Sequence, residues 1–294
     1  MGQWDAWIGR EQRASDRLDE GLAARWYATF DLVPCRPRPD AHAPMPQGIH
    51  FALCTPDAQT SALGEDGHPA RDDSQNSFLP PFPQFVSGPR RMWASSDIEF
   101  HAPLRLGAEI KRVSRVTSIT EKAGRSGMLA FVTVDHETVA DGELAVREKQ
   151  TLVYREAADP QAPLSPPELG DGTFDEGEWD YTLTLVPDER LLFRFSALTF
   201  NTHRIHYDAP YAREVERYRG LVVHGPLTAS LLLQFASREI SELRNDAKAF
   251  SFRGISPAIA GETLHLAGRL DGTEYELGAF ADDGRQVMAA RIAG

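Results

Sequence analysis

The chain has 294 residues, of which 41% are hydrophobic and 25% charged, so it can bury a sizeable core and has the composition of a soluble globular protein. Its 31 basic and 43 acidic residues give a net charge of −12, which argues against a nucleic-acid-binding protein that works through a broad basic face. An anionic substrate is still compatible with this charge, because a few local arginines can bind it. The length predicts one large domain or two smaller ones.

No membrane-spanning or targeting segment is expected from the sequence. The most apolar stretch, Leu221 to Ala236, is interrupted by polar residues and is too short to cross a bilayer. The N-terminus lacks a basic start followed by an apolar run, so no signal peptide is expected. Cys35 and Cys54 are the only cysteines in the sequence, which fits a reducing compartment. We therefore expect a cytoplasmic protein that does not bind a membrane.

The first half of the chain predicts one helix, a long loop and then strands. A helix is expected from Ser15 or Asp16 to Phe30, because apolar residues recur at every fourth position. Residues 34–83 are rich in Pro, Asp, Ser and Gly and predict a loop with one short helix at residues 50–53 and a mobile polar segment at residues 66–77. Segments rich in β-branched and aromatic residues predict strands at residues 98–100, 110–119, 128–137 and 145–154.

The second half repeats this order after a Pro- and Gly-rich linker. It predicts a helix at residues 227–243 and strands at residues 249–253, 263–270, 273–281 and 286–292. A short block supports a duplication: Pro103 to Glu109 and Pro257 to Glu262 each have Pro, three residues, Gly and a following acid. We therefore predict a duplicated α+β unit, with an N-terminal domain at 1–157, a linker at 158–175 and a C-terminal domain at 176–294.

The segment from Asn201 to Asp208 concentrates side chains that can transfer or orient protons. Within eight residues it holds an amide, two imidazoles, a guanidinium and a carboxylate, in the order Asn201-Thr202-His203-Arg204-Ile205-His206-Tyr207-Asp208. It follows an apolar, strand-like run, so we place it on a loop where a strand ends, a common position for catalytic groups. The alternative is that each residue has a surface or capping role.

A second candidate segment is the helix start at His224-Gly225-Pro226. Pro226 falls in the first turn, where its missing N–H costs little. The free N–H groups and the dipole of a helix start can polarise a carbonyl or hold an oxyanion, and Gly225 lets a ligand oxygen come close. Together the two segments supply a proton-transfer group and an oxyanion donor.

These residues resemble the MaoC-like dehydratase/hydratase family, which has the hot-dog fold. The family carries Asp-x-Asn-Pro-x-His on a loop and Ala-His-Gly at the start of its central helix, and His206 and His224-Gly225 take the matching positions. The wider string, with Gly88-Pro89-Arg90-Arg91-Met92-Trp93, is similar to a two-domain group that includes mitochondrial-type 3-hydroxyacyl-thioester dehydratases and bacterial mesaconyl-C4-CoA or itaconyl-CoA hydratases. The resemblance covers most of residues 80–294. It implies a double hot-dog, with the active site in the C-terminal half and the N-terminal half shaping the substrate tunnel.

The sequence departs from the family pattern at the catalytic Asp. Asn201 stands there in an ungapped register, and a gapped register leaves no Asp there either. Because an amide cannot take up a proton, the resemblance implies that His206 is the main acid–base group, that Asn201 orients water and that the Gly225 N–H binds the thioester oxygen. His203 is a weaker candidate for a proton relay. His224 is a candidate to hold the loop in place and to bind the substrate.

The resemblance implies reversible hydration of an enoyl-CoA with a short dicarboxylic acyl group, itaconyl-CoA or mesaconyl-C4-CoA giving citramalyl-CoA. The free carboxylate needs a cation, and the candidates are Arg90, Arg91, Arg204 and Arg253. The alternatives are a 3-hydroxyacyl-ACP or -CoA dehydratase of fatty-acid metabolism, a hot-dog thioesterase and a non-catalytic acyl-binding subunit. No metal or cofactor is expected, and a homodimer is the candidate assembly.

Overall fold

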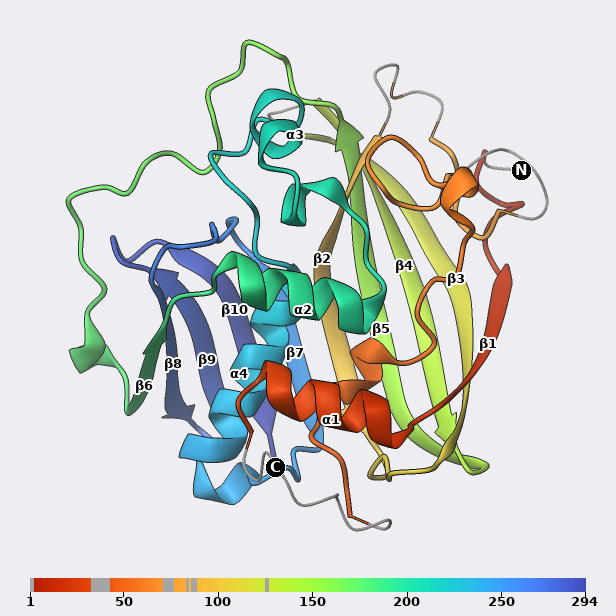
Figure 1. Cartoon of the computed structure of the whole chain (residues 1–294), viewed down its shortest axis with the longest axis vertical. Coiled ribbons are helices and arrows are strands. Elements are labelled where there is room, and N and C mark those ends of the chain that lie inside the picture. The colour runs from red at the N-terminus through yellow and green to blue at the C-terminus, as the bar shows by residue number, and fades with distance from the viewer. Residues whose placement is uncertain (1–2, 33–42, 71–76, 83–84, 86–88, 125–126) are drawn as a thin grey trace.

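The computed structural model describes residues 3–32, 43–70, 77–82, 85, 89–124 and 127–294, so Cys35 lies outside the described residues. Within them, ten antiparallel strands form one curved sheet around a group of helices (Figure 1). The strands are β1 (Glu11–Arg17), β2 (Pro89–Phe100), β3 (Glu109–Gly124), β4 (Gly127–Ala140), β5 (Glu143–Glu156), β6 (Tyr181–Leu185), β7 (Ala249–Gly254), β8 (Leu264–Asp271), β9 (Glu274–Ala281) and β10 (Gln286–Ala293). No helix in the described part of the chain is long and apolar enough to cross a membrane.

The sheet contains the same five-strand arrangement twice. The N-terminal half has the order β1-β3-β4-β5-β2, and the C-terminal half repeats it as β6-β8-β9-β10-β7. The two copies join edge to edge where β2 pairs with β7. The two similar sequence blocks occupy the same connection in each copy, and their glycines, Gly107 and Gly261, both have a left-handed φ, of 86° and 84°. The topology therefore supports the predicted duplication.

The helices of the described residues are α1 (Glu20–Thr29), α2 (Glu189–Thr199), α3 (Ala209–Glu214) and α4 (Gly225–Glu239), with the short turns η1 (Ile49–Ala52), η2 (Thr60–Ala62), η3 (Glu176–Glu178), η4 (Arg204–His206) and η5 (Ser241–Leu243). Of these, α1, α2 and α4 pack together inside the curve of the sheet, whereas the short α3 packs with η4 in a separate cluster (Figure 1). Figure 1 shows α1, α2 and α4 stacked across one face of the sheet. Their buried side chains, among them Trp26, Phe195 and Phe235, form one core with those of the strands.

The first predicted helix starts later than the sequence indicated. It begins at Glu20, with the Asp19 side chain accepting a hydrogen bond from a backbone N–H in the first turn, and residues 11–17 form β1 instead. Neither Ser15 nor Asp16 caps a helix, because both lie in this strand. The strand escaped prediction because it contains almost no apolar residues and is an edge strand.

The segment before the Asn201 loop is a helix, so the prediction that this loop follows a strand is wrong. Leu192, Phe195 and Leu198 are buried at helical spacing along α2, and Asp188 caps its N-terminus by accepting from Leu191 N–H at 3.0 Å. The later strand predictions agree with β7 to β10 to within a residue or two at each end.

The two halves differ in the helix that covers the sheet. Between its first two strands, the C-terminal half has α2 and then the fifteen-residue α4, which packs against β8, β9 and β10. At the equivalent place the described residues of the N-terminal half form α1 and then the short turns η1 and η2. The inner face of the N-terminal sheet is therefore left partly uncovered, and side chains of β3, β4 and β5 line a cavity there.

Candidate active site

The end of α2 and a tight turn after it position the Asn201 loop. Phe200 ends the helix in the left-handed conformation with φ of 49°, and Asn201 Oδ1 then accepts a hydrogen bond from His203 N–H at 2.9 Å. Asp208 closes the loop as the N-cap of α3 by accepting from Tyr211 N–H at 3.1 Å. The alternative capping role therefore applies to Asp208.

His206 is buried in a fixed tautomer. Its Nδ1 lies 2.7 Å from the carbonyl oxygen of Val222, and because a carbonyl can only accept, Nδ1 carries the proton. Burial lowers the pKa of His206 to about 3, so the imidazole is neutral. Its Nε2 is therefore an unprotonated acceptor, which is the form that a general base requires.

The start of α4 lies directly beside His206. The ring of His224, the residue before the helix, stacks on that of His206 with centroids 3.6 Å apart, and His224 Nε2 lies 2.9 Å from Ser196 Oγ. Burial also lowers the pKa of His224 well below its usual range. A Cβ added to Gly225 would meet only the carbonyl oxygen of Trp93, at 3.9 Å, so Gly225 faces open space.

A cavity of about 570 Å³ joins the two segments. Five of the six predicted residues of the loop and helix start line it, all except Arg204: Asn201, His203, His206, His224 and Gly225. The opposite wall comes from the N-terminal half and includes Trp93, Leu152 and Gln150. The structure thus brings the predicted loop and helix start together in one site that both halves build.

The predicted arginines divide into one that lines the cavity and three that do not. Arg91 is part of the cavity wall, and its charge is one cause of the lowered pKa of His203, after burial and neighbouring histidines. Arg90 and Arg204 each form an ion pair with an acidic neighbour, and Arg253 is exposed on β7. None of these three lies among the residues that line the cavity.

The N-terminal wall carries polar side chains that the sequence analysis missed. Glu148 accepts a hydrogen bond from Ser96 Oγ at 2.6 Å, and burial raises the pKa of its carboxyl to about 7. His136 lies 2.7 Å from Ser114 Oγ, and burial lowers its pKa to about 3. Arg112 lines the same wall and donates to the carbonyl oxygen of Leu53 at 3.1 Å. The available signal was that Arg112, His136 and Glu148 each lie within a predicted strand.

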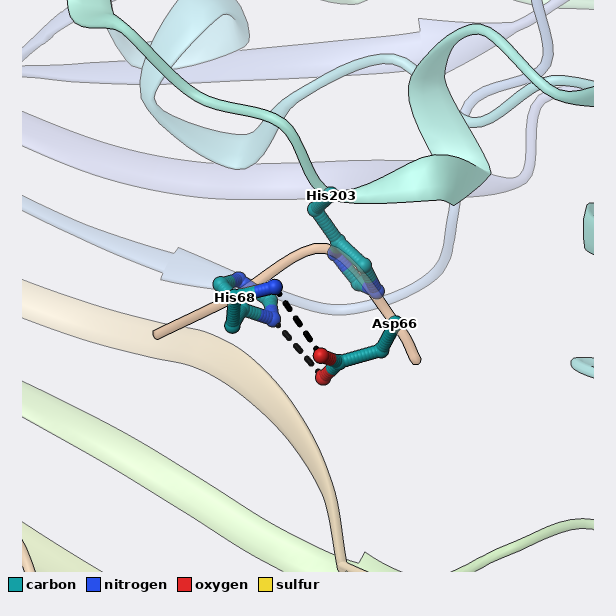
Figure 2. Close-up of side chains that lie close together, drawn as sticks. All are labelled: Asp66, His68 and His203. Carbon is teal, nitrogen blue, oxygen red and sulfur yellow. Dashed lines mark hydrogen bonds and ion pairs between the residues drawn. The ribbon is translucent and has the colours of Figure 1, made fainter. Parts of the chain in front are cut away.

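Asp66 and His68 are the other residues that sequence reasoning missed. Together with His203 they place one potential ligand atom each within 4.8 Å of one another, so two imidazoles and a carboxylate could hold a divalent metal here (Figure 2). The segment 66–77 was expected to be mobile; residues 71–76 lie outside the described part, but Asp66 and His68 are fixed against the Asn201 loop. The sequence Asp66-Gly67-His68 is typical of an ordinary turn, so it did not indicate a site.

Comparison with known proteins places this site in a family. Residues 48–260 match the family described as hydroxyacyl-thioester dehydratase type 2, and this match covers most of the chain. The chain is 42% identical over 98% of its length to the mesaconyl-C(4)-CoA hydratase of Chloroflexus aurantiacus, of which it covers 97%. It is 28% identical over 74% of its length to the mitochondrial hydroxyacyl-thioester dehydratase type 2 of Schizosaccharomyces pombe, of which it covers 76%.

Solved structures support the fold. A MaoC-like dehydratase from Phytophthora capsici matches with a TM-score of 0.67 at 11% identity, covering 99% of this chain and 98% of that one. A Mycobacterium tuberculosis protein described as a double hot-dog matches with a TM-score of 0.53 at 15% identity, covering 97% and 95%. The chain has a double hot-dog fold and belongs to the hydroxyacyl-thioester dehydratase type 2 family. It is an enzyme of the hydro-lyase class, which adds water to a carbon–carbon double bond or forms that double bond by removing water.

Proposed function

We propose that this enzyme reversibly hydrates the enoyl-CoA thioester of a short, branched dicarboxylic acid, with mesaconyl-C4-CoA or itaconyl-CoA as substrate and citramalyl-CoA as product. The observation that carries the reaction is the unprotonated Nε2 of buried His206, which lines the same cavity as the helix start at Gly225. The substrate class is supported by the 42% identity to a mesaconyl-C(4)-CoA hydratase along almost the whole chain.

The site geometry supports a stepwise addition of water. The Gly225 N–H, at the positive end of α4, binds the thioester oxygen and stabilises the enolate that forms when water adds to C3. Asn201 orients the water, and His206 Nε2 accepts its proton as the C3–O bond forms. The enolate then takes a proton back from His206 at C2, which restores the thioester carbonyl and returns His206 to its neutral form. Dehydration follows the same steps in reverse.

Arg91 is the proposed partner of the free carboxylate. The main chain of the acyl group has four carbons, so this carboxylate lies only about 5 Å from the thioester carbon and its partner must be near the catalytic loop. The charge of Arg91 acts on His203 of that loop, whereas the charge of Arg112 acts on Glu148 and His136 in the N-terminal wall. Arg91 therefore has the better position, and its planar guanidinium suits a bidentate contact.

A substrate panel tests this proposal. We expect kcat/KM to be at least about a hundredfold higher for mesaconyl-C4-CoA or itaconyl-CoA than for crotonyl-CoA and 2-octenoyl-CoA, because a neutral chain cannot form the ion pair with the guanidinium. Arg91→Met should remove most of this preference, while Arg253→Met, on the exposed side of β7, should not. Equal or higher rates with the neutral chains would rule out the dicarboxylate proposal.

The same panel separates the other functions. Hydration of 2-octenoyl-CoA, or of the corresponding acyl carrier protein thioester, would favour the fatty-acid dehydratase, a function supported by the similarity to the Schizosaccharomyces pombe enzyme. Release of free CoA would indicate a thioesterase, and binding without turnover an acyl-binding subunit. A cytoplasmic location and a homodimer complete the proposal, and cell fractionation and light scattering test them.

A further inference from the structure

The cavity continues from the catalytic groups onto the part of the N-terminal sheet that the helices leave uncovered. A Cβ on Gly225 would lie 3.9 Å from the carbonyl oxygen of Trp93, so a thioester bound at Gly225 lies beside Trp93 of β2. Phe200 and Ile255 line the cavity next to the catalytic loop and β7 and are 60% and 45% exposed, so the CoA part can leave the cavity there. The acyl chain then points along the N-terminal sheet.

The strand register places a polar band across this wall of the cavity. Trp93 pairs with Leu152 of β5, and the next two residues of β5 that line the cavity are Gln150 and Glu148. Because side chains alternate between the two faces of a strand, Lys149 between them lies on the outer face, where it is exposed. At about 3.3 Å per residue, Gln150 lies about 7 Å and Glu148 about 13 Å beyond the level of Leu152.

The protein satisfies the polar groups of this band only in part. The Ser96 hydroxyl accepts from Trp93 Nε1 at 2.8 Å and donates to Glu148 Oε1 at 2.6 Å, and Gln150 Oε1 lies 3.4 Å from His136 Nε2. The second oxygen of Glu148 and the amide nitrogen of Gln150 have no hydrogen-bond partner among the described residues. Only water or a polar ligand group in the cavity can therefore pair with these two atoms.

A long alkyl chain would reach this band, whereas a short one would not. At about 1.2 Å per bond, a four-carbon chain ends about 4 Å from the thioester carbon, and an eight-carbon chain ends about 8 Å from it, level with Gln150. The methyl end of the longer chain would displace water from the polar atoms without offering them a hydrogen bond, which weakens binding.

We infer that Gln150 and Glu148 form a polar barrier that limits the main chain of the acyl group to about six carbons. The two residues thereby determine the size of the substrate, while the catalytic loop and Gly225 carry out the reaction. This inference rests on the proposed acyl-CoA substrate and names what restricts its length. The four-carbon main chain of mesaconyl-C4-CoA ends before the band.

Two neutral saturated esters, butyryl-CoA and octanoyl-CoA, isolate the effect of length. They carry no free carboxylate, so the proposed contact with Arg91 does not distinguish them, and neither can be hydrated. In a wholly apolar tunnel, the four additional methylenes of octanoyl-CoA would tighten binding by about a hundredfold. With the barrier in place, we expect the wild type to bind octanoyl-CoA no more tightly than butyryl-CoA.

Calorimetric titration of the full chain tests this expectation. In the double variant Glu148→Leu, Gln150→Leu, the Kd of butyryl-CoA divided by that of octanoyl-CoA should rise at least about thirtyfold, because the methyl end then meets apolar side chains. The kcat/KM for 2-octenoyl-CoA relative to crotonyl-CoA should rise in parallel. Gln150→Leu alone removes only the 3.4 Å contact and should raise the Kd ratio at least about threefold, which keeps the test open if the double variant does not fold.

Lys149→Leu is the matched control, because it places the same apolar side chain on the outer face of the same strand and should leave the Kd ratio unchanged. The inference is overturned if the wild type binds octanoyl-CoA more than about tenfold tighter than butyryl-CoA, or if the folded leucine variants keep the wild-type ratio. A wild type that binds neither ester overturns the proposed function as well. Binding in the expected order without hydration of mesaconyl-C4-CoA would overturn the proposed function alone.

Discussion

The two ring nitrogens of His206 differ because only one of them faces a carbonyl oxygen. The 2.7 Å contact from Nδ1 to Val222 fixes the tautomer, and burial keeps the ring neutral, with a pKa of about 3. The stacked ring of His224, itself held by Ser196, limits rotation of His206. Val222, His224 and Ser196 thus fix the tautomer and the orientation of the His206 base, although none of the three takes part in the proposed proton transfer.

Replacing His206 removes this base. We expect His206→Ala to lower kcat on mesaconyl-C4-CoA by about a hundredfold or more, the usual contribution of a positioned acid–base group. Circular dichroism should show that the variant is folded. His101→Ala, at an exposed position paired with Glu99, is the control and should keep full activity. A folded His206 variant with more than a third of the wild-type rate would contradict the assignment.

Asn201 distinguishes this site from an ordinary Asp/His pair. Asn201→Asp keeps the Oδ1 acceptor that holds His203 N–H, so the loop should retain its shape. If the amide orients water, the change should lower kcat by about tenfold, because a carboxylate cannot donate a hydrogen bond to the water oxygen. Steady-state kinetics at pH 7 measure this, and unchanged or higher activity would instead favour the Asp/His mechanism.

Gly225 is predicted to matter for its N–H and its lack of a side chain. A Cβ here clashes with nothing, so Gly225→Ala and Gly225→Val should both fold. The side chain occupies the space of the thioester oxygen, and we expect a graded loss of kcat that reaches about a hundredfold for valine. Thermal unfolding provides the check on folding. Equal activity of the three proteins would remove Gly225 from the oxyanion site.

At the scale of elements, the sequence predicts best where apolar residues define a face. Strands β3 to β5 and β7 to β10 were found from their β-branched and aromatic residues, but only residues 98–100 of the central strand β2 were predicted; Pro226 correctly indicated the start of α4. Strand β1 was missed because pairing with β3, not burial, holds it in place. The Asn201 loop was found from its side chains alone, whereas the Asp66–His68 pair reaches it only through tertiary contact, which no local pattern reveals.

The contact between these two loops predicts a selective effect at Gly67. Gly67→Ala should lower kcat at least about tenfold, because the Cβ would overlap the carbonyl oxygen of Thr202 and separate the loops. Gly107→Ala is the matched control, since it has the same left-handed φ but nothing within 4 Å of an added Cβ. Gly107→Ala should lose about 1 kcal/mol of stability through backbone strain, Gly67→Ala should lose more because of the overlap, and only Gly67→Ala should lose activity. Equal activities would show that the loop contact does not serve the site.

At the scale of the whole molecule, the duplication could be predicted and the difference between the halves could not. A short block of Pro, Gly and acid indicated two related units, and the strand order repeats in both. The sequence did not show that the N-terminal half has the short turn η1 where the C-terminal half has the long helix α4. The segment around η1 was predicted to be a loop, and a loop prediction does not show that a helix is missing. Since the absence of a long helix over this part of the sheet was not predicted, the polar residues on β4 and β5 were not recognised as cavity residues.

Buried neutral histidines should make the whole protein acid-sensitive. Burial lowers the pKa of His50, His136 and His206 to about 3, so below pH 6.5 the unfolded chain binds protons that the folded chain does not. Each such histidine should therefore cost about 2 kcal/mol between pH 7 and pH 5. The raised pKa of Glu148, about 7, acts in the opposite direction over the same range and offsets about one of them.

His50 isolates this effect, because it is 3% exposed and neither ring nitrogen has a hydrogen-bond partner among the described residues. In His50→Leu, the loss of unfolding free energy between pH 7 and pH 5 should be smaller than in the wild type by about 2 kcal/mol. Urea denaturation at both pH values measures the difference. A variant with the wild-type pH slope would show that His50 does not stay neutral in the fold.

Because the N-terminal copy has the four-residue turn η1 in place of a long helix, the two copies of the fold tolerate different substitutions. In the C-terminal copy, α4 ties the sheet to the catalytic groups, so substitutions there disturb packing and chemistry together. In the N-terminal copy, the side chains of His136, Glu148 and Gln150 line the cavity and do not pack against a long helix. A lineage can therefore exchange these side chains, and with them the acyl group that the enzyme accepts, while the reaction itself stays the same.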